Sequence, residues 1–329
     1  MGKLKITLAC WDHPRLRPIF DGLIQAEGID LNCIPLSPIE IFWRMLKYGD
    51  FDASEMSLSA YIIDQCSSKP RFIALPFFPS RVFRHSALFI NRNAGIRTPE
   101  DLKGKKIGVP EYHLTAALWV RGFLQHDYGV SPEDVEWYVG GLEEPGRKKR
   151  IEEELPKRIR IHEIAPDQTL NDLLERGLIS ALITPHRPPC FLQNTGNVGL
   201  LFPNFKEVER DYFRRTGILP IMHTVVVKRE IYEKHPWVTQ SLYKALVEAS
   251  TSVESTLFHS ALRYTLPWLQ QDWEEAQELF GVEIFPSGVA PNWKTLEAVV
   301  SYSYEQGLAT RELRPAELFA PNTLEQCKD

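Results

Sequence analysis

The sequence predicts an α/β protein of two lobes, each built on a mainly parallel sheet flanked by helices. The chain has 329 residues, of which 43% are hydrophobic and 25% are charged, and this composition is ordinary for a globular protein. At about 150 residues per domain, the length favours two domains. Apolar runs of strand length alternate with helical segments almost from the start, an order that is typical of parallel sheets.

In the first part of the chain, strands are expected at residues 5–9, 29–32, 51–56 and 87–90, and a helix at 17–26. Another helix begins at Ser37, because Ser37 offers a capping hydroxyl, Pro38 suits the first helical position and Glu40 reaches back to the helix start. Gly49 ends this helix, since glycine adopts the left-handed conformation that follows a last turn.

The second part of the chain repeats this order. We expect a one-turn helix at 98–104, a strand at 105–109, helices at 114–127 and 170–177, strands at 179–184 and 225–227, and mainly helix after 230. Two stretches, RMLKYGDFDASEMS and DLLERGLISALITP, share a helix, a glycine stop, a short strand and a polar strand end. This echo predicts two similar half-domains.

Composition excludes several classes of protein. The net charge of -5 indicates no nucleic acid and no membrane surface as a partner. No apolar run approaches about 18 residues, so no transmembrane helix is expected. The five cysteines are Cys10, Cys33, Cys66, Cys190 and Cys327. Their wide spacing predicts neither disulfides nor a zinc knuckle. The first residues read as a strand and not as a signal peptide, so a cytoplasmic protein with reduced thiols is expected. A homo-oligomer is compatible with the sequence.

Longer motifs carry a resemblance. The chain resembles the type II periplasmic-binding-protein fold in the stretch TPEDLKGKKIGVP, which a helix follows. It is similar to the 4,5-dihydroxyphthalate decarboxylase family in FPSRVFRHSALFIN, GVPEYHLTAALWVRGFLQHDYGV and YFRRTGILPIMHTVVV. The resemblance implies a carboxy-lyase that removes one carboxylate from a hydroxylated aromatic dicarboxylate. A substrate of the 4,5-dihydroxyphthalate type would give a hydroxybenzoate such as protocatechuate.

In a two-lobe fold of this kind the chain passes between the lobes twice. We expect the crossings near His85 and His223. The predicted first lobe comprises residues 1–86 and 224–329, and the second comprises 87–223. Crossing segments line the floor of the cleft between two lobes, where ligands bind.

The stretch before the first crossing carries two arginines. Arg81 and Arg84 each offer a planar fork that matches a carboxylate bidentately. A buried aromatic diacid needs such anchors, because an unpaired buried carboxylate is very unfavourable. We therefore predict that these arginines bind substrate, while an exposed basic turn is the alternative.

Aryl decarboxylation without a cofactor needs a proton at the ring carbon that bears the carboxylate, and a base for a phenolic proton. Histidine suits both tasks near neutral pH. His85 and His223, at the two crossings, are therefore the predicted proton-transfer pair. Glu55, at the end of a buried strand, is a third catalytic candidate or a member of a structural ion pair.

Further substrate-binding candidates follow strands in both halves. His13 follows the first strand, and His186 with Arg187 follows the corresponding strand of the second half. Tyr112 and Thr115 open the helix after residues 107–109, where backbone N–H groups and hydroxyls bind anions. Ordinary helix capping is the alternative for this pair.

A metal site is left open as an alternative. The candidate ligands are Asp12, His13, Glu55, His85, His186 and His223. No short motif such as H-E-x-x-H supports them, so we predict no metal and no cofactor, with a divalent ion not excluded. The alternative function is a non-catalytic binding protein for an aromatic acid. In both cases the partner is a small aromatic acid.

Overall fold

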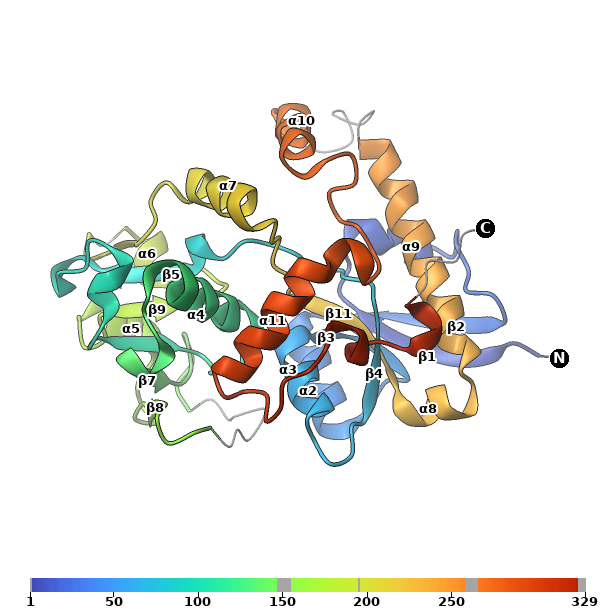
Figure 1. The fold of residues 1–329 in the computed structure, drawn as a ribbon, viewed down its shortest axis with the longest axis horizontal. Helices are drawn as coiled ribbons and strands as arrows, with labels where there is room; N and C mark the ends of the chain where they lie inside the picture. The colour runs from blue at the N-terminus through green and yellow to red at the C-terminus, as the bar shows by residue number, and fades with distance from the viewer. Residues whose placement is uncertain (1, 147–154, 195, 258–265, 325–329) are drawn as a thin grey trace. The chain divides into compact units, whose positions relative to one another are not determined.

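The computed structural model describes residues 2–146, 155–194, 196–257 and 266–324. Contacts divide the chain into two compact units (Figure 1). The first unit comprises Met1–Arg81, Ile221–Glu297 and Leu313–Asp329, and the second comprises Val82–Pro220 and Ala298–Glu312.

Besides shifts of a few residues near the two expected crossings, the division differs from the sequence interpretation in one segment. Residues 298–312 group with the second unit, whereas the predicted first lobe took in everything after residue 223. The reason is side-chain packing on α4 (Thr115–Tyr128). The Nε of Arg121 donates a hydrogen bond to Gln306 Oε1 at 2.7 Å, and the ring of Tyr302 lies directly against Gly122. The predicted lobe boundaries stay a prediction.

The helices and strands of the first unit are β1 (Leu4–Cys10), α1 (Arg17–Phe20), β2 (Ile29–Pro35), α2 (Pro38–Tyr48), β3 (Ala53–Ser57), α3 (Leu58–Gln65), β4 (Phe72–Leu75), β11 (His223–Lys228), α8 (Arg229–Lys234), α9 (Trp237–Leu257) and α10 (Leu269–Phe280). Those of the second unit are β5 (Leu88–Asn91), β6 (Lys106–Val109), α4, β7 (Glu136–Val139), β8 (Arg160–Glu163), α5 (Leu170–Glu175), β9 (Ala181–Ile183), α6 (Pro189–Leu192), β10 (Val198–Leu200) and α7 (Phe205–Thr216). The unit boundary at residues 297 and 298 falls inside α11 (Trp293–Glu305).

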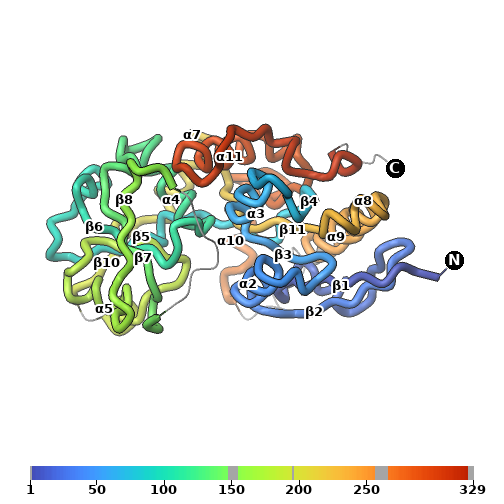
Figure 2. The backbone as a smooth tube through the Cα atoms, turned by 90° about the horizontal axis from the view of Figure 1, so that it is seen from below, coloured from blue at the N-terminus to red at the C-terminus, as the bar shows by residue number. Residues whose placement is uncertain are grey.

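The sheet of the first unit has the strand order β2-β1-β3-β11-β4. β1 pairs in parallel with both β2 and β3, and β11 runs antiparallel to β3 and β4. Figure 2 shows these strands together, with α2 beside β3. Apolar side chains of β1, β11 and α9 form one continuous buried cluster. The parallel strands β1 and β3 therefore end at the same edge of a well-packed sheet.

The sheet of the second unit has the order β10-β5-β9-β6-β7-β8. β6 pairs in parallel with β7 and β9, β7 pairs in parallel with β8, and β5 runs antiparallel to β9 and β10. Both described sheets are mainly parallel, as the sequence predicts, and each also contains one reversed strand, which was not predicted.

Local sequence signals explain where helices begin and end. The hydroxyl of Ser37 accepts a hydrogen bond from the N–H of Glu40, and Gly49 ends α2 with a φ of 63°, as predicted. The expected helix at 17–26 is wrong, because α1 already ends at Phe20. The carbonyl of Pro18 there accepts hydrogen bonds from two later N–H groups in a turn, which prevents a regular helix.

No helix in the described ranges is long and apolar enough to cross a membrane. The described cysteines, Cys10, Cys33, Cys66 and Cys190, are free thiols. Cys327 lies outside the described residues.

Candidate active site

Four residues from three distant parts of the sequence meet at one edge of the first sheet. Glu55 lies in β3, and β1 runs parallel to it with Ala9 opposite Ser54. Cys10 at the end of β1 and His13 just beyond it therefore arrive beside Glu55. The antiparallel strand β11 begins at His223, which lies opposite Ser57. The parallel strands β1 and β3 thus bring in Cys10, His13 and Glu55, and the reversed strand β11 brings in His223.

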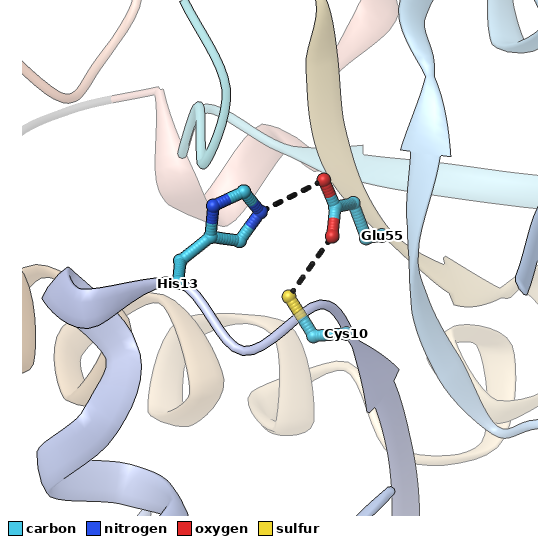
Figure 3. A group of neighbouring side chains, drawn as sticks. All are labelled: Cys10, His13 and Glu55. Atoms are coloured by element: carbon cyan, nitrogen blue, oxygen red, sulfur yellow. Dashed lines mark hydrogen bonds and ion pairs between the residues drawn. The ribbon is translucent and has the colours of Figure 1, made fainter. Parts of the chain in front are cut away.

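The carboxylate of Glu55 is surrounded by hydrogen-bond partners. His13 Nε2 lies 3.0 Å and His223 Nδ1 lies 2.6 Å from the same oxygen, Oε1. The other oxygen, Oε2, accepts from the N–H of Trp11 at 2.9 Å and from Cys10 Sγ at 3.4 Å. Figure 3 shows the His13 ring and the Cys10 thiol reaching different oxygens of the carboxylate. All four partners approach a side chain that is 0% exposed.

This arrangement determines the charge of Glu55. Burial alone would raise the pKa of the carboxyl group, but hydrogen bonds and charge from His13 and His223 outweigh burial and hold the pKa well below its usual range. An ionised carboxylate only accepts hydrogen bonds. Both imidazoles must therefore donate to it, His13 from Nε2 and His223 from Nδ1.

The same reasoning fixes which nitrogens remain available for chemistry. These are Nδ1 of His13 and Nε2 of His223, and Figure 3 shows the former on the side of the ring away from Glu55. The two imidazole side chains are 12% and 18% exposed. Each ring packs edge-on against an aromatic neighbour, Trp11 at 5.4 Å for His13 and Phe42 at 4.9 Å for His223. Two oriented imidazoles on an ionised carboxylate are suited to proton transfer.

Cys10 was not among the residues singled out from the sequence. Its side chain is fully buried, and burial, followed by the charge of Glu55, raises the pKa of its thiol. It therefore lies protonated against the carboxylate. Cys10 directly follows the strand expected at residues 5–9, but no local pattern indicates that this strand pairs beside the strand of Glu55. Cys10, His13 and Glu55 also offer metal-ligating atoms that all lie within 4.8 Å of one another.

Of the predicted carboxylate anchors, Arg81 lies on the segment beside His223. Its backbone bridges to Ile221, and the carbonyl of Ser80 accepts from the N–H of His223. Burial, helped by the charge of Arg15, lowers the pKa of Arg81 to about 9. A guanidinium Nη1 donates to the carbonyl of Pro286 at 3.3 Å. A half-buried cation at this place suits an anion-binding role, which stays a prediction.

Arg15 was also missed by the sequence analysis. Its Nη2 donates to the carbonyls of Phe78 and Pro79 at 3.0 and 2.9 Å, and its guanidinium lies over the ring of Phe285 at 4.5 Å. Arg15 thereby holds the backbone that leads to Arg81. No spacing rule predicts such a contact, because it depends on two loops meeting in space.

The other candidates belong to the second unit. His85 is 1% exposed, and its ring stacks on Phe123 with centroids 4.1 Å apart. Its backbone N–H donates to Glu209. Burial lowers the pKa of Arg84 to about 10, and the charge of Glu209 partly offsets this. The roles predicted for His85 and Arg84 stay predictions.

The remaining predicted substrate-binding residues lie in the second unit, around α4 and after β9. Tyr112 is buried, and its hydroxyl donates to the carbonyl of Gln306 at 3.3 Å. Thr115 is the buried first residue of α4. His186 and Arg187 are exposed after β9. Their roles in substrate binding also stay predictions. Asp12, a candidate metal ligand, pairs with Arg17 at 3.3 Å.

Comparison with known proteins adds the family. No protein-family model matches the chain. A 4,5-dihydroxyphthalate decarboxylase from Comamonas testosteroni is 38% identical over 330 residues, which cover all of both chains. Another protein of that name, from Pseudomonas putida, is 40% identical over 214 residues, or 65% of this chain and 83% of the relative.

Solved structures support the fold. The periplasmic aliphatic sulphonate binding protein SsuA from Escherichia coli matches with a TM-score of 0.54 and 12% identity, over 99% of this chain and 100% of SsuA. The predicted periplasmic-binding-protein-like α/β fold is therefore confirmed. The full-length similarity to a decarboxylase confirms the family resemblance as well. The chain belongs to the 4,5-dihydroxyphthalate decarboxylase family.

Proposed function

We propose that this protein is a carboxy-lyase that removes one carboxylate from a hydroxylated aromatic dicarboxylate of the 4,5-dihydroxyphthalate type. The product would be a hydroxybenzoate such as protocatechuate. Family membership supports the reaction. The observation that carries the assignment of residues is the buried carboxylate of Glu55, which hydrogen-bonds two imidazoles through one oxygen.

The proposed reaction begins with protonation of the ring carbon that bears the departing carboxylate. This step creates a cationic, dienone-like intermediate, and loss of the proton from the para hydroxyl stabilises it. The bond between ring and carboxylate then breaks, CO2 leaves and its electron pair restores aromaticity. In sum, the ring gains one proton and loses CO2, while the phenolic proton that a base removes returns to the product.

His13 and His223 share the acid and base roles in this proposal. One protonated imidazole delivers the ring proton, and the other accepts the phenolic proton. Glu55 orients both rings and stabilises the imidazolium form by its charge. The geometry favours His13 over His85 as the partner of His223, because both rings share Glu55. Arg81 and Arg84 are proposed to bind the carboxylate that is spared.

The function is tested by incubating the purified protein with 4,5-dihydroxyphthalate in buffer with and without a chelator. We expect CO2 and the monoacid product in both samples. Binding of the diacid without release of CO2 would instead support the non-catalytic binding protein. Turnover only without chelator would show that a metal ion takes part.

A further inference from the structure

The Glu55 cluster contains a set of atoms that proton transfer does not need. Cys10 Sγ lies 3.4 Å from Oε2 of Glu55, and His13 Nε2 lies 3.0 Å from Oε1 (Figure 3). The sulfur, the nitrogen and a carboxylate oxygen all lie within 4.8 Å of one another. The buried thiol of Cys10 has no role in a decarboxylation in which imidazoles transfer the protons.

The spacing matches a small tetrahedral ion. Zinc bonds of about 2.0 to 2.3 Å place neighbouring ligand atoms about 3.3 to 3.6 Å apart. The separations of 3.0 and 3.4 Å, which run to the two different oxygens of Glu55, are close to these values. Because the three ligand atoms lie within 4.8 Å of one another, rotations of the side chains could bring them onto one ion. The side chain of His13 is 12% exposed, so the cluster is not completely closed to solvent.

The ligand types select among ions. Sulfur and imidazole favour Zn²⁺ and Co²⁺, whereas Mg²⁺ and Ca²⁺ prefer oxygen ligands. The N–H of Trp11 and the ring of His223 already hold the carboxylate of Glu55 in place. Such partners behind a ligand orient it and strengthen the site.

We propose that Cys10, His13 and Glu55 bind Zn²⁺ and that the bound ion inhibits decarboxylation. The inhibition rests on the proposed function, whereas the binding does not. On binding, the thiol of Cys10 releases one proton to the buffer and a sulfur–metal bond forms. Nε2 of His13 must offer its lone pair to the ion, so the ring proton moves to Nδ1. That nitrogen then always carries a proton and cannot accept one from the substrate.

Binding is tested by titrating the metal-free protein with Co²⁺ and recording the thiolate-to-cobalt charge-transfer absorption. We expect one ion per chain with this band in the wild type and in Cys190→Ser, which removes a buried thiol of the second unit. Cys10→Ser should lose the band. Absence of the band from the wild type, or its persistence in Cys10→Ser, would overturn the site.

A second variant guards against misfolding of Cys10→Ser. His13→Gln keeps a donor for Glu55 but removes the imidazole ligand, and it should bind Co²⁺ more weakly than the wild type. Isothermal titration in two buffers of different ionisation enthalpy should detect one proton released per ion. Mg²⁺ should produce neither signal. Equal Co²⁺ affinity in His13→Gln and the wild type would contradict the role of His13.

Inhibition is tested with Zn²⁺ and 4,5-dihydroxyphthalate, each variant being compared with its own metal-free rate. The wild-type rate should fall by roughly 10²-fold or more, the usual share of acid–base catalysis, and a chelator should restore it. Cys10→Ser should be far less sensitive. An unchanged rate with a full cobalt band would overturn the inhibition. Binding by a protein that never releases CO2 would leave the metal site standing and refute the proposed function.

Discussion

At the residue scale, the charge of Glu55 determines the chemistry of the cluster. Hydrogen bonds from His13 and His223 keep its carboxyl group ionised. A neutral carboxylic acid would need an acceptor for its own O–H group, whereas the N–H of Trp11 and the thiol of Cys10 both donate to Oε2. The ionised form therefore sets the tautomers of His13 and His223. Nδ1 of His13 and Nε2 of His223 are then the ring nitrogens that do not contact Glu55.

The two histidines offer a test that separates catalysis from packing. His223 contacts Glu55 through Nδ1, so His223→Asn keeps a donor near that position and removes the distal nitrogen. His223→Ala removes both. If the distal nitrogen transfers a proton, both variants should lose about 10²–10⁴-fold in kcat, with little change in KM. Recovery of kcat in His223→Asn would reduce the residue to a positioning role.

For His13 the matched substitution is glutamine, because this ring contacts Glu55 through Nε2. His13→Gln and His13→Ala should both reduce kcat by about 10²–10⁴-fold, and the solvent isotope effect on turnover should change. A loss confined to His85→Ala, with His13 variants active, would return the proton-transfer role to His85.

The arginine anchors are tested by substitutions that keep the charge. Arg81→Lys and Arg84→Lys lose the planar fork. If the replaced arginine binds a carboxylate of the diacid, the lysine variant should bind the diacid more weakly by about 1.5–3 kcal/mol. Titration calorimetry measures this directly. Unchanged affinity in both variants would leave the two arginines as structural cations.

Sequence reasoning singled out Glu55, His13 and His223 separately, with Glu55 and His223 as catalytic candidates and His13 as a substrate-binding candidate, and these roles stay predictions. Strand ends and chain crossings can be read from patterns, so each residue was a candidate. That two rings would share one oxygen depends on the order β1-β3-β11 of the sheet. No local pattern contains this order, and Cys10 was missed for the same reason.

At the element scale, helix starts and stops were predictable where side chains and glycine act locally. Ser37 and Gly49 delimit α2 as expected. The helix expected at 17–26 is too long, because a turn closed on the carbonyl of Pro18 follows α1. The apolar residues of this turn resemble a helical pattern in the sequence. The packing of α11 on α4 has no sequence signal at all, since it depends on a single glycine meeting a distant ring.

Replacement of Gly122 in α4 by a larger residue should therefore destabilise the fold. A Cβ at this position would lie 2.1 Å from the ring of Tyr302 in α11. Gly122→Ala should lower the free energy of unfolding by about 1–3 kcal/mol, the range for overpacked cores, as measured by urea denaturation.

The matched background is Tyr302→Ala, which removes the ring. There the same Gly122→Ala change should be neutral or stabilising by up to about 1 kcal/mol, since alanine favours helix. An equal loss in both backgrounds would mean that the ring is not the obstacle.

At the scale of the whole molecule, alkaline pH should destabilise the fold. Burial raises the pKa of Tyr302 to about 12 and that of Cys33 to about 11, and it also raises the pKa values of Tyr61 and Tyr212. These groups stay neutral when folded, while unfolded tyrosines ionise near pH 10. The folded chain thus binds more protons, so stability is present below that pH and is lost as pH rises towards 12.

The midpoint of urea unfolding, monitored by circular dichroism, should therefore decrease from pH 8 to pH 9.5 and again to pH 11. Tyr302→Phe should show a shallower decline than the wild type. A midpoint that is constant or higher at pH 11 would contradict the assigned burial of these groups.

The class of fold and the family were accessible from the sequence, because strand–helix alternation and long motifs spread over most of the chain. The assignment of residues 298–312 was not accessible, because the contacts of Tyr302 and Gln306 arise only after the chain has folded.

The central claim is that an ionised Glu55, shared by two imidazoles, drives a metal-free decarboxylation. Its most direct test is the rate of CO2 release from 4,5-dihydroxyphthalate by the wild type and by Glu55→Gln in buffer with chelator. Glutamine keeps the shape but carries no charge and presents an amide donor to the two rings. We predict an active wild type and a fall in kcat of about 10²–10⁴-fold in the variant, with KM nearly unchanged. A Glu55→Gln enzyme that keeps kcat within about tenfold, well below the usual contribution of acid–base catalysis, would contradict the account.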